Sequence, residues 1–235
     1  MFALQLALSG LAQGAIYALV ALSMCVVYRA TTVVNFGHGD LVMAGAFVVY
    51  LLVVMAGLPF LASAVLAVAL LFLLGLVIEL GLIERIKAGP HIGFALMCIA
   101  FGYVLRGIAR GVWGREVLPM PTVFDFAPLM LGELVLTADA LVIFAAVGVL
   151  LAPITLLHPG LGAGFLIKGF AAMTLGGFGS FGGAVAGGLL LGLAEQLVGG
   201  YVSTKLIDIT AYLVIILVLA LRPNGLFGRA IAEKV

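Results

Sequence analysis

The first apolar run of the sequence, residues 2–28, contains no charged residue. An α-helix rises about 1.5 Å per residue and the hydrocarbon core of a bilayer is about 30 Å thick, so roughly 20 apolar residues cross it. The run is long enough to do so as one uninterrupted helix. It therefore predicts a membrane-spanning segment.

Composition extends this prediction to the whole chain. Hydrophobic residues make up 65% of the sequence and charged residues 9%, against about 25% charged residues in soluble domains. A soluble fold would have too few charges to cover its surface, so we expect an integral membrane protein. The net charge of +1 gives no electrostatic reason to expect nucleic acid as a partner. Cys25 and Cys98 lie in apolar runs and are expected to be packing residues.

Further apolar runs predict an all-α, polytopic membrane protein with about six to seven transmembrane or re-entrant helices, in one transmembrane domain over residues 1–235. These runs are residues 33–56, 60–83, 92–112, 165–198 and 207–221. Residues 140–152 are apolar but too few to span. Residues 113–138 contain three prolines and are expected to form an extramembrane loop. Arg106 and Arg110 share a helix face and are expected to snorkel to the interface.

Orientation follows from the basic residues, which favour the cytoplasmic side. Arg29, the pair Arg85/Lys87 and the trio Arg222/Arg229/Lys234 are expected to be cytoplasmic, with the N-terminus outside. Beyond residue 112, the alternation of helix ends between the two sides of the membrane can be satisfied in two ways. Either residues 165–198 contain a re-entrant segment, or a crossing is missing near residue 152.

Two glycine-rich stretches interrupt the apolar sequence: NFGHGD at residues 35–40 and GGFGSFGG at residues 176–183. Broken segments in two parts of a transporter sequence point to its substrate path, because freed backbone groups are tolerated only beside protein or water. The alternative is that the glycines only allow close helix packing, as the G-x-x-x-G pairs Gly183/Gly187 and Gly188/Gly192 suggest. The substrate-path candidates are Asn35, Phe36, Gly37, His38, Gly39, Asp40, Gly176, Gly177, Gly179, Ser180 and Gly182.

Three of these candidates have more specific interpretations. His38 either binds a ligand or relays a proton, or else satisfies backbone groups freed by the break. Asp40 is expected to cap the following helix or to complement its dipole. Gly179 is expected either to have no room for a side chain or to need a positive φ, so Gly179→Leu should abolish transport.

Nucleotide chemistry is not expected in this chain. Gly177, Gly179 and Gly182 match G-x-G-x-x-G, but apolar membrane sequence flanks them instead of a strand and an amphipathic helix. No phosphate-binding G-x-x-x-x-G-K-[ST] motif occurs, and no catalytic or metal-ligand spacing appears. The chain is therefore not expected to be an enzyme or to bind a cofactor, and any ATP would be used by a partner subunit.

The sequence resembles the permease subunits of branched-chain amino acid ABC importers over almost its whole length. The resemblance lies in YRATTVVNFGHGDLVMAGAFVVY, in the LRG and WG pairs at residues 105–107 and 113–114, in residues 153–204, and in LVIILVLALRPNGLFGR. It implies a multi-pass protein of the bacterial inner membrane that imports branched-chain amino acids by alternating access. It also implies a homologous second permease, two cytoplasmic ATPase subunits, a periplasmic substrate-binding protein and membrane lipid as partners.

One stretch departs from the family pattern. The resemblance implies a further transmembrane and cytoplasmic stretch, with a coupling helix for the ATPase, that is absent near residues 142–153. The remaining coupling candidates are Glu84, Arg85 and Lys87.

Other functions stay open: a permease for urea, short amides or other amino acids, an ATP-independent channel or secondary transporter, and a non-transporting scaffold.

Overall fold

The computed structural model describes residues 2–78, 80–81, 91–119, 129–131, 134–136 and 158–228. The chain divides into two compact units. Unit 1 comprises Met1–Thr32, Phe124–Val149 and Ile167–Val235, and unit 2 comprises Val33–Val123 and Leu150–Leu166. Unit 1 therefore combines the first helix of the chain with the last ones.

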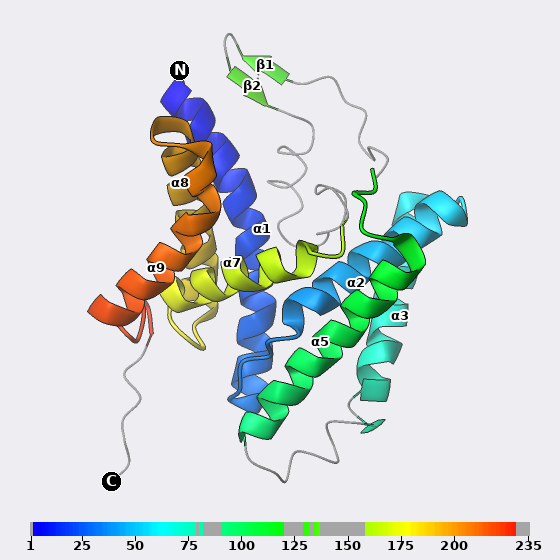
Figure 1. Cartoon of the computed structure of the whole chain (residues 1–235). Helices are drawn as coiled ribbons and strands as arrows, with labels where there is room; N and C mark the ends of the chain where they lie inside the picture. Colours follow the sequence, from blue (N-terminus) through cyan, green and yellow to red (C-terminus); the bar gives the residue numbers. More distant parts are fainter. Residues whose placement is uncertain are drawn as a thin grey trace, which may run out of the picture. The chain divides into compact units, whose positions relative to one another are not determined.

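Six helices of the described residues are long and apolar enough to cross a membrane, which confirms the predicted all-α polytopic class (Figure 1). A seventh, α7 (Leu161–Gly176), is apolar but shorter. The six are formed by α1 (Phe2–Thr31), α2 (His38–Tyr50) with its π-helical extension (Leu51–Met55), α3 (Phe60–Ile78), α5 (His91–Trp113), α8 (Phe181–Tyr201), and α9 (Ile207–Leu221) with the 3-10 turn before it (Thr204–Leu206).

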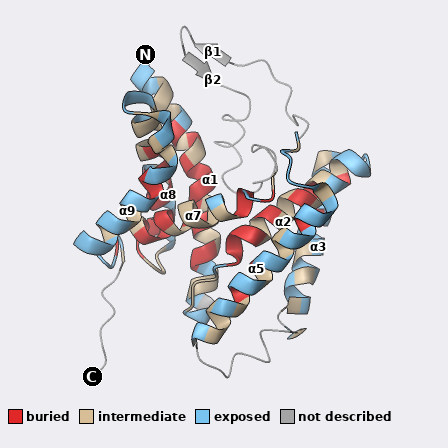
Figure 2. Cartoon of the chain, in the orientation of Figure 1, coloured by how far each residue is buried: buried red, intermediate tan, exposed pale blue. Residues whose placement is uncertain are grey.

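In unit 1, α1 and α8 lie antiparallel along their length. The rings of Phe2 and Tyr201 stack edge to face at one end, 5.9 Å apart. At the other end the guanidinium of Arg29 lies 4.7 Å from the centre of the Phe181 ring. Between these ends small residues allow the two backbones to approach closely, and buried residues line both helices (Figure 2).

The glycines of α8 serve two different neighbours. A Cβ on Gly188 or Gly192 would collide with the backbone of α1, whereas one on Gly183 or Gly187 would collide with the backbone of α7. Each G-x-x-x-G pair therefore faces one partner helix. The predicted close packing is confirmed for both pairs.

Unit 2 is built around α2, which packs against α3 and α5. Met43 and Phe47 of α2 meet Ala109 of α5 and Leu161 in one apolar cluster. On the α3 side, Val49 and Leu52 pack with Ala67. The other faces of α3 and α5 are largely exposed apolar side chains (Figure 2), as expected for surfaces that meet lipid or a partner subunit.

Both glycine motifs lie where one helix ends and the next begins. The run at residues 165–198 divides into α7 and α8, and both ways of satisfying the predicted alternation remain predictions. The NFGHGD stretch does not interrupt a helix: Asn35–Gly37 precede α2 and His38 begins it. In the predicted extramembrane segment, α5 ends at Trp113 and a short hairpin pairs β1 (Leu129–Leu131) with β2 (Leu134–Leu136).

Candidate functional site

The turn between α7 and α8 depends on glycine at two positions. Gly177 and Gly179 have φ angles of +105° and +78°, a region that side chains with a Cβ rarely adopt. Ser180 then begins α8, because its hydroxyl oxygen accepts a hydrogen bond from the N–H of Gly183 at 3.1 Å. Glycine conformation and a serine cap thus set the direction in which α8 starts.

The space around these glycines decides between the two interpretations of Gly179. A Cβ there would have only Arg29 Cγ within 4 Å, at 3.9 Å. Lack of room is therefore the wrong explanation, and the positive φ is the reason for glycine. At Gly177 both reasons apply, since a Cβ would also collide with the backbone of Gly228. At Gly182 neither applies, because nothing lies within 4 Å.

A pocket of about 630 Å³ opens beside this turn. The chain after α9 closes against the turn, with the N–H of Leu226 bonded to the carbonyl of Leu175 and that of Phe227 to Gly176. These bonds satisfy carbonyls left free at the end of α7. The motif thus lies at the end of unit 1 that carries Arg29 and Arg222, and not halfway along its helices. The pocket is lined by Tyr28, Arg29, Phe178, Gly179, Ser180, Phe181, Pro223, Asn224, Phe227 and Gly228.

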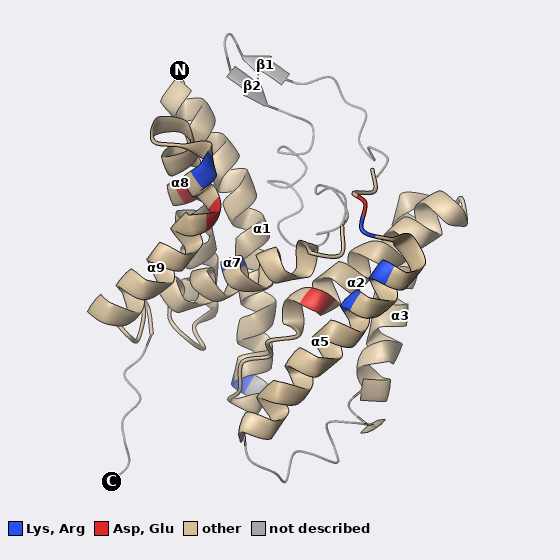
Figure 3. Ribbon diagram, in the orientation of Figure 1, with Lys and Arg blue, Asp and Glu red and all other residues tan. Residues whose placement is uncertain are grey.

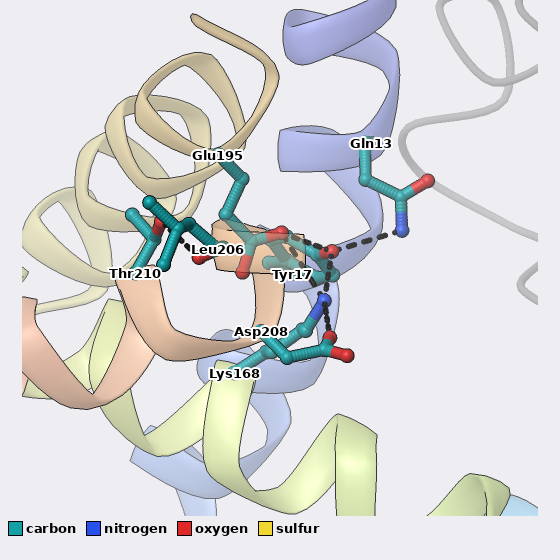
Figure 4. A network of polar contacts seen from close by, with 7 residues as sticks. All are labelled: Gln13, Tyr17, Lys168, Glu195, Leu206, Asp208 and Thr210. Carbon is teal, nitrogen blue, oxygen red and sulfur yellow. Dashed lines mark hydrogen bonds and ion pairs between the residues drawn. The ribbon is translucent and has the colours of Figure 1, made fainter. Parts of the chain in front are cut away.

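Away from this turn, unit 1 holds a network of charged and polar side chains (Figure 4). The ammonium of Lys168 contacts Glu195 Oε2 at 3.2 Å, Asp208 Oδ1 at 3.3 Å and the hydroxyl of Tyr17 at 3.1 Å. The Tyr17 hydroxyl also donates to Glu195 Oε2 at 2.7 Å. Four helices therefore meet at one lysine.

The burial of this network is uneven. The side chain of Glu195 is 1% exposed, whereas that of Asp208 is 87% exposed. The second oxygen of Glu195, Oε1, has no hydrogen-bond partner among the described residues. A charge held inside a membrane span is costly and is usually retained for function. The network is therefore a stronger candidate for a functional element than the exposed charges of the chain.

Sequence reasoning missed this network. Its four members are separated by up to 191 positions in the chain, and only the fold brings them together. The available signal was the presence of Lys168 and Glu195 inside apolar runs, since such residues are functional candidates by default.

In unit 2, the NFGHGD stretch forms a tight polar turn against α5. The side-chain carbonyl of Asn35 accepts the N–H of Gly37 at 2.9 Å, the Asx-turn geometry that favours asparagine at such positions. A Cβ on Gly37 would collide with the carbonyl of Cys98, and one on Gly39 with Gly162. Gly37 thus brings the start of α2 against α5, and Gly39 brings it against the start of α7.

Asp40 in that first turn forms a bidentate ion pair with Arg106 of α5. Nε contacts Oδ1 at 2.5 Å and an Nη contacts Oδ2 at 2.9 Å, and the aspartate side chain is 3% exposed. Gly102 provides the room, because a Cβ there would collide with the carboxylate. Charged residues are sparse along the described helices (Figure 3).

This ion pair corrects two predictions. Arg106 does not snorkel, because its guanidinium is held by a buried carboxylate of another helix. Asp40 does not cap α2, since the N-cap position is Gly37 and no side chain caps the helix. The dipole interpretation of Asp40 fits its place in the first turn.

The other predicted residues have the following places. His38 is buried and Phe36 is exposed, and the two interpretations of His38 remain predictions. Cys25 and Cys98 are buried free thiols, as predicted. The coupling candidates Glu84, Arg85 and Lys87 lie outside the described residues.

The two glycine motifs fall in different units. Their role as a substrate path remains a prediction. No group of His, Cys, Asp and Glu that could hold a metal ion occurs within the described ranges.

These features define an α-helical, multi-pass membrane protein with charged side chains held inside its spans. The profile of one family, described as the permease component of the branched-chain amino acid transport system, matches residues 6–150, more than half of the chain. The chain therefore belongs to this family. It is a multi-pass protein of the inner membrane.

Curated relatives match over the full length. The chain is 26% identical to the high-affinity branched-chain amino acid transport system permease protein LivH of Escherichia coli (strain K12), with 100% of this chain and 98% of the relative covered. It is 24% identical to BraD of Pseudomonas aeruginosa, with 99% and 98% covered. No solved structure matches the chain.

The alignment with LivH runs over 303 residues, more than the 235 of this chain. The relative therefore has positions without a counterpart here. The predicted place of this difference, residues 142–153, lies outside the described residues.

Proposed function

We propose that this chain is the membrane-spanning permease subunit of an ATP-driven importer, and that it carries branched-chain amino acids across the inner membrane by alternating access. The observation that carries the proposal is the family match over residues 6–150. The relatives LivH and BraD are permease proteins of branched-chain amino acid transport systems, and they match over nearly their whole length.

Such a permease works with other subunits. We expect a homologous second permease, two cytoplasmic ATPase subunits that bind and hydrolyse ATP, and a periplasmic protein that delivers the substrate. On this proposal the chain itself binds no cofactor and catalyses no reaction. The chain contributes a substrate path that opens alternately to the two sides of the membrane.

Two features of the fold support a moving role. Lys168 joins α7 to α1, α8 and α9 through polar contacts, and Arg106 joins α5 to α2. Polar contacts between helices in a bilayer can be exchanged for others when helices shift. The glycine turn at Gly177–Ser180 starts α8, and the N-terminus of a helix can bind a substrate carboxylate.

Reconstituted transport tests the proposal. The complete complex in proteoliposomes should accumulate radiolabelled leucine only when ATP, the ATPase subunits and the binding protein are all present. Valine and isoleucine should compete for this uptake, and urea and acetamide should not. Leucine uptake by this chain alone would instead identify an ATP-independent channel or secondary transporter.

A further inference from the structure

We infer that the outer end of unit 2 carries a carboxylate-binding site formed by Arg110, Arg115 and His158. These side chains line one pocket of about 320 Å³ together with Pro159 and Gly160. Arg110 stands in the last turn of α5, Arg115 follows the helix end, and His158 precedes α7. Two segments far apart in the sequence thus bring three basic side chains to one hollow.

The donors of this pocket are available to a ligand. Arg106, one turn earlier on α5, is neutralised by Asp40. Neither Arg110 nor Arg115 has an ion-pair partner in the part of the chain that the structure describes. His158 accepts the N–H of Gly160 at Nδ1, at 3.1 Å, so its neutral ring carries the proton at Nε2 and can donate from there.

None of the described residues that line the pocket has an acidic side chain. Two guanidinium groups and an imidazole N–H form a set of donors with positive charge and no acceptor. The complementary ligand is an oxyanion with planar geometry, because a guanidinium pairs with a carboxylate through two parallel hydrogen bonds. A pocket of this size admits a carboxylate with its neighbouring atoms.

The predicted orientation puts this pocket on the side from which the substrate arrives. The loop before α5 contains Arg85 and Lys87 and is expected inside, so the end of α5 faces outside. The same bias disfavours arginine at an outer helix end. Arg110 and Arg115 therefore stand there against the topological preference, as expected if they have a binding role.

Two sources can supply the carboxylate. One is the α-carboxylate of the free amino acid, and the other is an Asp or Glu side chain of the delivering protein. The choice between these two sources rests on the proposed function, whereas the binding of a carboxylate at the pocket does not. An experiment with two arms separates the sources.

The variants are Arg110→Gln/Arg115→Gln, Arg110→Lys, and His158→Gln, each in the full chain in lipid nanodiscs. The matched control is Lys205→Gln, which removes an exposed positive charge after α8, at the end of unit 1 where Phe2 meets Tyr201. In the first arm, equilibrium binding of L-leucine is compared with that of leucinamide, which lacks the carboxylate. In the second arm, the affinity of the periplasmic binding protein for the assembled importer is measured at low and high salt.

A site for the free amino acid predicts that the double variant loses leucine binding at least about tenfold, and that leucinamide binds weakly to every form. A docking role predicts an equal loss in the second arm, with a smaller salt dependence than in the parent. Arg110→Lys should retain part of the binding, because it keeps the charge without the bidentate geometry.

The inference is overturned if the double variant matches Lys205→Gln in both arms. Thermal unfolding of each variant separates loss of binding from loss of folding, and His158→Gln provides a second test should the double variant unfold. The leucine arm requires neither ATP nor partner subunits. Its result therefore stands even if ATP-driven uptake fails, and the two proposals fail separately.

Discussion

At the scale of single residues, Gly179 and Gly182 stand three positions apart in one motif and meet different constraints. Gly179 has a φ of +78° with open space around it, and Gly182 sits in the first turn of α8 with nothing within 4 Å of its Cβ position. The first needs glycine for its backbone conformation. The second needs it for neither conformation nor space.

Alanine at these two positions separates conformation from packing. Gly179→Ala should destabilise the protein by about 1–2 kcal/mol, the cost of a left-handed residue with a Cβ. Gly182→Ala should be neutral or stabilising by up to about 1 kcal/mol, since alanine favours helix. Thermal unfolding in the same detergent measures both. Equal effects would contradict the conformational argument.

Asp40 and Arg106 offer a second residue-scale test, because each leaves the other unpaired when removed. Asp40→Asn and Arg106→Gln should each cost about 3 kcal/mol or more. The double variant should cost less than the sum of the two, since neither charge is then left buried alone. A double-mutant cycle on unfolding free energies gives the coupling, and additive effects would show that the pair contributes nothing.

The two carboxylates around Lys168 form a matched pair. Glu195 and Asp208 contact the same ammonium at 3.2 and 3.3 Å but differ in exposure, 1% against 87%. Glu195→Gln should therefore destabilise by about 2 kcal/mol, and Asp208→Asn by at most about 1 kcal/mol. Chemical unfolding of both variants makes the comparison. A larger loss for Asp208→Asn would show that α9, and not α8, anchors the lysine.

At the scale of elements, α8 packs through two glycine faces, one against α1 and one against α7. A methyl group at Gly192 would meet the backbone of Gly10 and Gly14 and has nowhere to move. Backbone atoms thus determine whether each face tolerates a residue larger than glycine, because they cannot rotate away as side chains can.

Gly192→Ala should therefore lower stability by about 1–3 kcal/mol. Gly107→Ala is the control, because Gly107 is also helical and nothing lies within 4 Å of its Cβ position. Unfolding midpoints of the two variants, measured side by side, test the packing. An unchanged midpoint for Gly192→Ala would mean that α1 and α8 do not approach as described.

The elements were largely predictable from the sequence, whereas the contacts of charged residues were not. Long apolar runs and glycine-rich stretches are local signals, so the helices and the turn between α7 and α8 follow from them, whereas the NFGHGD stretch precedes α2 and does not interrupt it. The pairing of Asp40 with Arg106 depends on how α2 crosses α5 at Gly102, which no local pattern contains. The spacing of Arg106 on its own helix predicted snorkelling. That spacing contains no information about a partner helix, so it could not predict the contact with Asp40.

At the scale of the whole molecule, the basic residues predict which ends of the helices face the cytoplasm. Within unit 1, Arg29 and Arg222 belong to the end with the glycine turn, and Tyr201 meets Phe2 at the other. The two ends of this unit should therefore be exposed to opposite sides of the membrane.

Cysteine labelling tests this orientation. Cys25 and Cys98 are first replaced by alanine, and a single cysteine is then introduced at the exposed residues Val202 or Asn224. A membrane-impermeant maleimide added to intact spheroplasts should label Val202→Cys and leave Asn224→Cys unlabelled, with the reverse in inverted vesicles. The opposite pattern would invert the predicted topology.

The composition of unit 1 has a consequence for how the protein is made. Its first helix leaves the ribosome about 150 residues before α8 begins. At roughly 5–20 residues per second, α1 waits on the order of ten seconds or more for its partner. During that time the residues of α1 that contact α8 have no partner helix; they are Gly10, Gly14, Tyr17 and Arg29. Newly inserted chains that stall before Phe181 should accordingly be the form that membrane chaperones and proteases recognise.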